Sequence, residues 1–442
     1  ALMPSYIIRS MRKMFSHCLK LSYKDTAQQN SYVTIPRAAN SFDNTEIAAN
    51  VDEDIIDSLT GGRLVGSVTS FENFAECPLR YYLRYGVDLK EREEFTFSPV
   101  NFGVVLHAVI REVCDEIKKN GESYYLISEE KRREMVKRSV AAITDIYQNS
   151  ILKDSSRNSF MIKRMEDLAD RTVWAMGEQL KCGDFVPFVF EHKFNMEVGD
   201  GDRKQLMSGT IDRVDICENG TDVYVRIIDY KTGKKDFNIV KTYYGIDIQL
   251  MVYMEAAMKL VAKMRPGKNV IPAGVFYYNI SDPIVSATTE SAEEIEDKIK
   301  GELRLKGMVN SDKDIAEKMD NNEGTSLNIP VSRKADGGFD SRRSKVMNTE
   351  QFNMLGRFVD VRAVDTADRI AGGDIRRSPY KDGQFSSCDR CPYGAVCGFS
   401  VDLPGCNYRK LKKFDDEVLW NNIKEGVDEN GKKMDTGAEE RD

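Results

Sequence analysis

A chain of 442 residues, 41% hydrophobic and 31% charged, is long enough for two or three packed domains and has the mixture of an ordinary globular protein. No apolar run reaches the roughly 18 to 20 residues of a membrane span, and the first residues lack the layout of a signal peptide, which argues against a membrane protein. The formal net charge of −7 argues against a basic coat for nucleic acid over the whole surface, but it does not exclude local basic patches.

We expect the two ends of the chain to be its least structured parts. Residues 1 to about 60 predict a short amphipathic helix and then a polar stretch, in which "DNTEIAANVDEDIID" has six acids and no base. We expect residues 1–62 to be the remnant of an upstream region with a linker. Residues 63–412 are expected to form one folded domain, and 413–442 an acidic C-terminal tail that is partly disordered.

Helical patterns dominate the next 120 residues. Ser70 is the predicted N-cap of a helix whose apolar stripe is broken at Pro78. The segment "NFGVVLHAVIREVCDEIKK" predicts an amphipathic helix with His107 at the border of its apolar face. Two further helices are predicted at 129–152 and 159–181.

The periodicity then switches to two. The segments "FVFEHKFNMEV", "KQLMSGTIDRVDIC" and "DVYVRIIDYKTG" predict a three-strand meander. A helix is predicted in "YYGIDIQLMVYMEAAMKLVAK", a strand in "VIPAGVFYYNI", a long polar insertion at 315–348, and a helix near 349–371. The elements therefore predict an α/β (α+β) protein.

The last two strands of the meander bring carboxylates together. With its turn at Asn219-Gly220, a two-residue turn places Asp212 diagonal to Asp229, and a four-residue loop places it directly opposite. Both arrangements put the two side chains on one face, which Val and Ile make a core face. Facing carboxylates repel each other, so this pattern predicts a divalent cation with oxygen ligands between them.

Lys231 points into the same site because it is two residues beyond Asp229. Such a lysine orients a water molecule or neutralises charge that develops on a phosphate. A solvated acid–lysine pair on a surface hairpin is the alternative, since a D-x-K triplet often arises by chance.

Other polar residues converge on this hairpin with weaker individual signals. An imidazole at His107 would reach a buried site, and Gln249 and Tyr253 share a helix face. The alternatives are a satisfied boundary histidine and ordinary core packing. Glu191 is either a supporting residue of the site or a surface acid.

The chain has nine cysteines, and the absence of secretory features indicates a reducing, cytoplasmic compartment in which clustered cysteines bind metal. Cys388, Cys391 and Cys397 form such a cluster, and either Cys406 or the distant Cys77 would supply a fourth ligand. Zinc is an alternative, but a pattern of one plus three suits an iron–sulfur cluster at least as well. Cys18, Cys114, Cys182 and Cys217 are expected to be ordinary buried thiols.

Several of these motifs together resemble a known family. "GTIDRVD", "DYKTG" and "QLMVYMEAA" resemble the core of RecB-type PD-(D/E)XK nucleases, and "GVVLHAVI" is similar to their histidine motif. The pairing of "SFENFAECPLRYYLRYGVDLKERE" with "SPYKDGQFSSCDRCPYGAVC" and "LPGCNYRKLKKFDDEVLW" resembles the nuclease portion of the B subunits of bacterial AddAB-type helicase–nucleases. The resemblance runs from about residue 4 to 423, so it makes residues 1–62 the end of a helicase-like region.

The resemblance implies a restriction-endonuclease-like PD-(D/E)XK core, with a central mixed sheet flanked by helices and with ends stapled by an iron–sulfur cluster. It makes His107, Asp212, Asp229 and the backbone carbonyl of Tyr230 ligands of Mg²⁺ or Mn²⁺. It also makes Lys231 the catalytic lysine, with Gln249 and Tyr253 positioning that lysine or the DNA strand. Cys77, Cys388, Cys391 and Cys397 would hold a [4Fe–4S] cluster. Cys406 is a departure, since the family is expected to have Asn there.

The implied function is a metal-dependent single-strand DNA exonuclease that forms a heterodimer with an AddA-type subunit. It would process double-strand break ends for recombinational repair by cutting the 5′-ended strand. Because no G-x4-G-K-[ST] loop occurs, we expect no ATP hydrolysis by this chain. The alternatives are a non-catalytic iron–sulfur module that binds DNA ends and a free-standing nuclease of the CRISPR-adaptation type.

Overall fold

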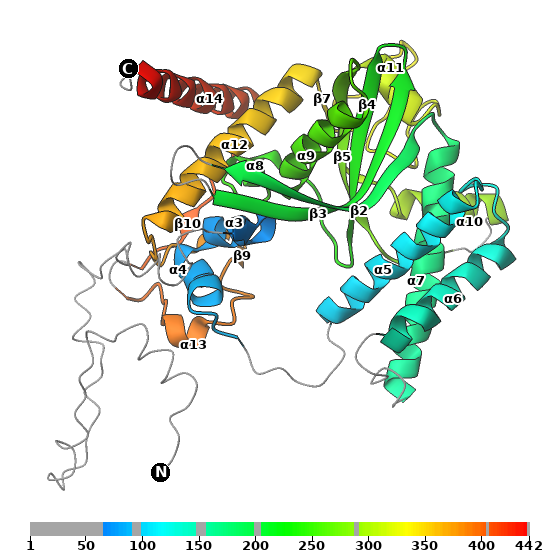
Figure 1. Ribbon diagram of the computed structural model, residues 1–442, viewed down its shortest axis with the longest axis horizontal. Helices are drawn as coiled ribbons and strands as arrows, with labels where there is room; N and C mark the ends of the chain where they lie inside the picture. The colour runs from blue at the N-terminus through cyan, green and yellow to red at the C-terminus, as the bar shows by residue number, and fades with distance from the viewer. Residues whose placement is uncertain are drawn as a thin grey trace, which may run out of the picture.

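The structure is a computed structural model that describes residues 65–90, 99–146, 156–198, 205–286, 291–403 and 406–439. The expectations for residues 1–62, including Cys18, lie outside these described residues. A central mixed sheet separates two layers of helices (Figure 1), which confirms the predicted fold class. Within the described part of the chain, no helix combines the length and the apolar character that a membrane crossing requires.

The sheet has seven strands. Six of them follow the order β1, β3, β4, β5, β6, β7, and β2 pairs with the edge of β3 that lies opposite β1 and β4. The strands are β1 (Val65–Ser67), β2 (Val186–Val198), β3 (Gln205–Asn219), β4 (Asp222–Lys231), β5 (Asn269–Asn279), β6 (Lys306–Asn310) and β7 (Val346–Met347). β2, β3 and β4 form the predicted antiparallel meander, and β4 then pairs in parallel with β5. β4 is therefore an interior strand with helices over both faces, which explains why its residues are almost all buried.

The two helical layers bury one core each. α5 (Pro99–Lys119), α6 (Glu129–Ile146) and α7 (Ser156–Lys181) pack on one face of the sheet, where the apolar stripe of α5 is fully buried. α9 (Gln249–Met264) and α12 (Thr349–Ala371) cover the other face together with α3 (Val68–Glu76). Helical periodicity therefore located the main helices, with α7 beginning three residues before the predicted position.

The first described helix begins earlier than predicted. Ser67, and not Ser70, is the N-cap of α3, because the hydroxyl oxygen of Ser67 accepts a hydrogen bond from the backbone N–H of Ser70 at 3.1 Å. Strand β1 ends at Ser67, so the chain turns into the helix as soon as it leaves the sheet. The predicted break is confirmed, since α3 ends before Cys77 and a new helix, α4 (Pro78–Tyr81), begins at the proline and continues as the π-helix η2 (Tyr82–Gly86).

Residues 75–89 lie beside residues 376–409, as the blue and orange segments of Figure 1 show. The later segment contains β8 (Tyr380–Asp382), β9 (Phe385–Ser386), α13 (Gly394–Cys397) and β10 (Arg409–Lys410). The backbone N–H of Leu79 donates to the carbonyl of Arg376 at 3.3 Å, and the hydroxyl of Tyr393 donates to the carbonyl of Leu89 at 2.9 Å. The guanidinium of Arg409 donates to the carbonyl of Ala75.

Two further segments contain regular structure. In the region 315–348, the buried carboxylate of Asp320 accepts hydrogen bonds from Ser326 and Asn328 at 2.5 and 3.2 Å, which hold this loop in place. It follows α10 (Ala292–Glu302) and contains most of α11 (Lys313–Met319). The acidic segment after residue 413 contains α14 (Asp416–Glu439), which packs on α12 through apolar residues such as Leu419 and Ile423.

Candidate active site

The site lies where β4 separates from β3. β4 pairs with β3 only from Arg213 to Asn219, and β1 occupies the same edge of β3 only from Leu206 to Ser208. The residues between these two pairings, including Asp212, are free of a strand on that edge. The carboxylate of Asp212 instead accepts a hydrogen bond from the backbone N–H of Tyr230 at 2.7 Å. The divergence of the strands therefore leaves room for side chains at the end of β4.

Asn219 faces Asp222, so the turn consists of Gly220 and Thr221, one residue later than the predicted Asn219-Gly220, and the register is the one predicted for a four-residue loop. Continued by one pair beyond Arg213 and Ile228, that register sets Asp212 against Asp229, and both side chains are buried, at 7% and 2% exposure. Burial and the charge of Asp212 raise the pKa of Asp229, and against the opposing effect of Lys231 it lies at about 7. The fold thus holds two carboxylates together at an electrostatic cost, as the alternation of the sequence predicted.

His107 and Glu191 complete a group around Asp212. The Nδ1 atom of His107 lies 3.5 Å from a carboxylate oxygen of Asp212 and 3.7 Å from one of Glu191. Burial lowers the pKa of His107, but hydrogen bonds to the two acids outweigh this effect and raise it to about 10. Glu191 has a φ of 48°, a left-handed conformation that costs a non-glycine residue about 1 kcal/mol or more and is frequent at functional sites.

This group has the donor chemistry of a metal site. Three potential ligand atoms lie within 4.8 Å of one another, one each from His107, Glu191 and Asp212. Among the described residues, this is the group of His, Cys, Asp or Glu side chains that is close enough to hold a metal ion. An imidazole together with carboxylate oxygens is a ligand set for a divalent cation. The buried carboxylate of Asp229 lies beside this group and is ion-paired with Lys231. The residues present therefore fit a divalent cation.

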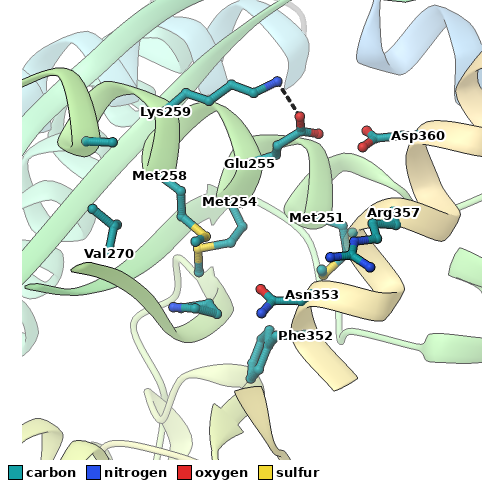
Figure 2. A pocket seen from close by; sticks show the side chains of 13 residues that line it. Met251, Met254, Glu255, Met258, Lys259, Val270, Phe352, Asn353, Arg357 and Asp360 are labelled. Carbon is teal, nitrogen blue, oxygen red and sulfur yellow. Dashed lines mark hydrogen bonds and ion pairs between the residues drawn. The ribbon is translucent and has the colours of Figure 1, made fainter. Parts of the chain in front are cut away.

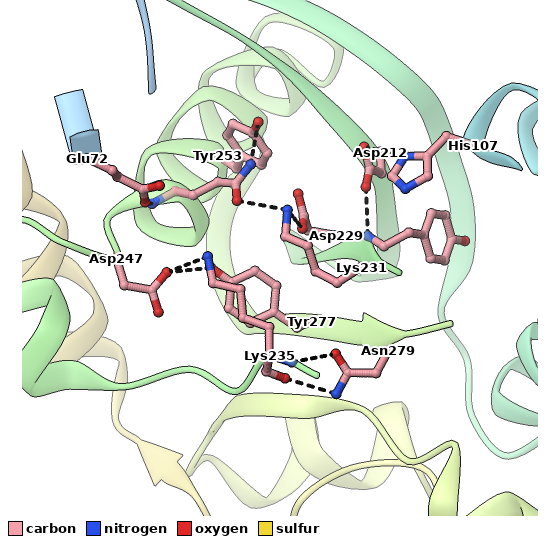
Figure 3. Close-up of polar contacts among 12 residues, drawn as sticks. Glu72, His107, Asp212, Asp229, Lys231, Lys235, Asp247, Tyr253, Tyr277 and Asn279 are labelled. Carbon is pink, nitrogen blue, oxygen red and sulfur yellow. Dashed lines mark hydrogen bonds and ion pairs between the residues drawn. The ribbon is translucent and has the colours of Figure 1, made fainter. Parts of the chain in front are cut away.

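Lys231 is held by the two other residues of the predicted site. Its ammonium donates a hydrogen bond to the amide oxygen of Gln249 at 3.0 Å, and the amide nitrogen of Gln249 lies 2.9 Å from the hydroxyl of Tyr253. Gln249 and Tyr253 are one helical turn apart at the start of α9, as predicted. This chain of hydrogen bonds fixes the ammonium next to Asp229 (Figure 3).

Four residues beside the site were not predicted: Glu72, Lys235, Asp247 and Tyr277, all drawn in Figure 3. The buried carboxylate of Glu72 accepts hydrogen bonds from the backbone N–H groups of Ile248 and Gln249 at 2.9 and 3.0 Å. Burial raises its pKa to about 7. The sequence signal was an acid within the apolar helix "SFENF", but its partner lies more than 170 residues away.

Cys77, Cys388, Cys391 and Cys397 come from the two neighbouring segments described above. Burial, with the charges of Cys77 and Cys391 adding to it, raises the pKa of the Cys397 thiol to about 11. Burial likewise raises the pKa of Cys388, which the same two cysteines also influence. Cys77 is thus the distant cysteine that comes close to the cluster, and thiols grouped in this way suit a soft metal centre. Of the cysteines expected to be ordinary, Cys114 and Cys217 are buried, and Cys182 is half-buried.

A pocket with a volume of about 420 Å³ lies on a different side of α9, between that helix and α12 (Figure 2). Met251, Met254 and Met258 line it, and Glu255 and Asp360 stand at its edge. It contains none of the residues predicted for the metal site. The position of the carboxylates, and not the presence of this cavity, therefore identifies the candidate active site.

Comparison with known proteins finds similar sequences over most of the chain. The family model of the PD-(D/E)XK nuclease superfamily matches residues 66–398. Proteins named as B subunits of an ATP-dependent helicase/deoxyribonuclease are similar over most of the chain. The protein from Lachnoclostridium phytofermentans is 34% identical over 399 residues, covering 88% of this chain and 34% of the relative. The protein from Clostridium acetobutylicum is 34% identical over 383 residues, which cover 84% of this chain and 33% of the relative. The chain spans about a third of the length of the curated relatives it matches.

Proposed function

The chain belongs to the PD-(D/E)XK nuclease superfamily, and from this premise we propose that it is a metal-dependent nuclease that hydrolyses single-stranded DNA. The observation that carries the proposal is the burial of Asp212 and Asp229 side by side, with His107, Glu191 and Lys231 around them. A stable fold gains nothing from buried carboxylates that repel each other, whereas a nuclease needs them to hold a cation.

In the proposed site His107, Asp212, Asp229 and the backbone carbonyl of Tyr230 hold Mg²⁺ or Mn²⁺, and Glu191 joins them. A bound ion supplies Lewis-acid polarisation of the scissile phosphate and lowers the pKa of a water molecule. The chain's own residues supply orientation and charge. The ammonium of Lys231 is a fixed donor for a phosphate oxygen, on which negative charge increases during hydrolysis.

Gln249 and Tyr253 are positioning residues in this proposal. Because Gln249 accepts from Lys231 and also contacts Tyr253, the ammonium cannot swing freely toward solvent. An oriented donor stabilises the transition state without having to reorganise during the reaction.

We also propose that Cys77, Cys388, Cys391 and Cys397 hold a [4Fe–4S] cluster that fastens the two ends of the nuclease domain, residues 63–412. Support comes from the mutual electrostatic influence of these thiols and from the backbone contacts that bring the two ends together. Cys406, which is buried, is not needed for this set.

The relatives are named as B subunits, and a B subunit implies a partner subunit. We propose that the complete protein works with an AddA-type helicase–nuclease and cuts the 5′-ended strand of unwound DNA at double-strand breaks. In this role residues 1–62 continue from a helicase-like region, and no ATP is hydrolysed by the present chain.

The test is cleavage of single-stranded oligonucleotides labelled at either the 5′ or the 3′ end, with Mg²⁺ and with EDTA. Asp229→Ala is expected to lower the cleavage rate at least about 100-fold, because the metal site loses a central carboxylate. The matched control is Asp236→Ala, which removes an exposed acid from the adjacent loop. Full activity of the Asp229 variant, or equal loss in both variants, would contradict the proposed site.

A further inference from the structure

A second lysine beside the proposed site has no part in the mechanism above. Lys235 lies in the loop that follows β4, and its side chain is 33% exposed. Its ammonium lies 3.0 Å from a carboxylate oxygen of Asp247 and 4.5 Å from the centre of the Tyr277 ring. The ammonium of Lys231 lies 5.6 Å from the same ring centre. Two ammonium groups therefore stand around one aromatic ring next to Asp229 (Figure 3).

The backbone of Lys235 is fixed from both sides. Its N–H donates to the side-chain oxygen of Asn279 at 3.0 Å, and its carbonyl accepts from the amide nitrogen of the same side chain at 3.0 Å. Asn279 is the last residue of β5, so the loop is fastened to the sheet at this one residue. Both of these hydrogen bonds of the Asn279 side chain go to Lys235, and not to its exposed neighbours Lys234 and Asp236.

The side chain of Lys235 is fixed as well. Its partner Asp247 is buried and accepts a hydrogen bond from the hydroxyl of Tyr277 at 2.6 Å, while the carbonyl of Asp247 accepts one from Thr242 at 2.8 Å. Ordering a lysine side chain costs conformational entropy, which the ion pair with Asp247 and the contact with the Tyr277 ring offset, so the ammonium is held in one place.

An ordered ammonium with an unused donor is suited to bind an anion. An ammonium has three donors, and Asp247 accepts from one side of it, while a third of the side chain faces solvent. Burial lowers the pKa of Lys235, but the charges of Asp247 and Glu72 outweigh this effect and raise it, so the group stays charged near neutral pH.

We propose that Lys235 is a phosphate-binding residue, which contacts a phosphodiester of the bound DNA strand next to the one that is cleaved. The inference rests on the proposed function, since it needs a strand whose scissile phosphate lies at Lys231. A single strand presents successive phosphates, and the two ammonium groups lie on the buried ring of Tyr277 with part of each side chain exposed to solvent. Lys235 would thus set which phosphate enters the metal site.

The experiment compares Lys235→Met with the native 442-residue chain in cleavage of a fluorescein-labelled single-stranded oligonucleotide with Mg²⁺. The loss of one phosphate contact is expected to raise KM about tenfold and to leave kcat within about twofold. In parallel, binding of the same oligonucleotide is measured by anisotropy in Ca²⁺ at several KCl concentrations. The slope of log Kd against log [KCl] should fall by about 0.7, the value for one phosphate contact on a single strand.

Two variants separate charge from structure. Lys234→Met removes the neighbouring exposed lysine and should leave KM and the salt slope unchanged. Lys235→Arg keeps the charge and should restore most of the salt slope, which a merely structural lysine would not do. Circular dichroism and melting temperature show whether each variant folds. If Lys235→Met does not fold, Asp247→Asn is used instead. That variant keeps the charge of Lys235 but removes the carboxylate that orders it, so KM should rise while the salt slope stays at the native value.

The outcomes distinguish this inference from the proposed function. If the native chain cleaves DNA but Lys235→Met has the native KM and salt slope, the phosphate contact is wrong and the nuclease proposal stands. The same conclusion follows if Lys234→Met shows equal changes. If the native chain neither binds nor cleaves the oligonucleotide, the proposed function fails and the phosphate contact fails with it.

Discussion

Asp229 and Asp360 are both carboxyl groups that the fold places beside another acid, but their surroundings differ. Asp229 has Lys231 and the group around Asp212, which suits a cation. Asp360 of α12 shares a hydrogen bond with Glu255 of α9, and Lys259 forms an ion pair with Glu255 (Figure 2). Burial, followed by Glu255, raises the pKa of Asp360 to about 8. Asp360 is therefore protonated in the folded protein near neutral pH.

The stability of the protein should depend on pH through Asp360. Its pKa in the folded protein, about 8, lies above the ordinary value of 3.8, so the folded state keeps a proton that the unfolded state loses as pH rises between these values. Stability from this group consequently falls from about pH 4 to pH 8. Asp360→Asn, which resembles the protonated form, should equal the native protein near pH 4 and exceed it by on the order of 1 kcal/mol at pH 8.

Urea denaturation at pH 5 and pH 8 measures this difference. Asp365→Asn on the same helix removes an exposed acid and serves as the control, with no gain that grows with pH. A constant difference between Asp360→Asn and native protein at both pH values would show that the carboxyl group ionises freely in the folded state.

At the scale of elements, the start of α9 depends on α3. Glu72 of α3 accepts from two backbone N–H groups at the first turn of α9, and that turn carries Gln249, which holds Lys231. A helix start leaves N–H groups without partners inside the helix, and here a distant carboxylate satisfies them. The contact thus connects the first described helix with the proposed catalytic lysine.

Glu72→Ala should destabilise the protein by about 1–3 kcal/mol, because two buried N–H groups lose their acceptor. It should also lower kcat, since Gln249 is no longer held in place. Glu72→Gln keeps an accepting oxygen and is expected to lose less of both. Thermal melting and cleavage of single-stranded DNA measure the two effects; an alanine variant with native stability and native kcat would exclude this role of α3.

Period-two alternation was sufficient to predict the β2–β4 meander and the face shared by Asp212 and Asp229, because hairpin partners are close in sequence. β1 and β6 were not predicted, since strands of three and five residues carry too short a pattern. The partners of Lys235 were also missed. Asp247 and Tyr277 come from separate elements, and only the parallel pairing of β4 with β5 brings Tyr277 to the site.

At the scale of the whole molecule, Cys77 and the three clustered cysteines come from segments that are about 300 residues apart in the chain. The spacing of Cys388, Cys391 and Cys397 predicted a metal centre but left two candidates for its fourth ligand. In the structure the charge of Cys77 influences the pKa of Cys388 and Cys397, and that of Cys391 influences the pKa of Cys77, which sequence spacing does not reveal.

Cys391→Ser is expected to abolish the iron content and the brown colour of anaerobically purified protein and to lower its melting temperature, because a cluster that joins two segments stabilises the fold. Cys182→Ser is the control, since that half-buried thiol lies at the end of α7 and should affect neither property. Iron and zinc analysis with the visible spectrum provides the measurement. Stoichiometric zinc without iron in the native protein would contradict the cluster.

The meeting of the chain ends also has a mechanical consequence. The segment that follows β1 bonds directly to the segment that precedes and includes β10, through Ala75, Leu79 and Leu89. A tension applied between these two points would pass through that short contact and would bypass the long strands of the sheet. The carboxylates at the end of β4 would then keep their spacing while the ends of the domain are under load.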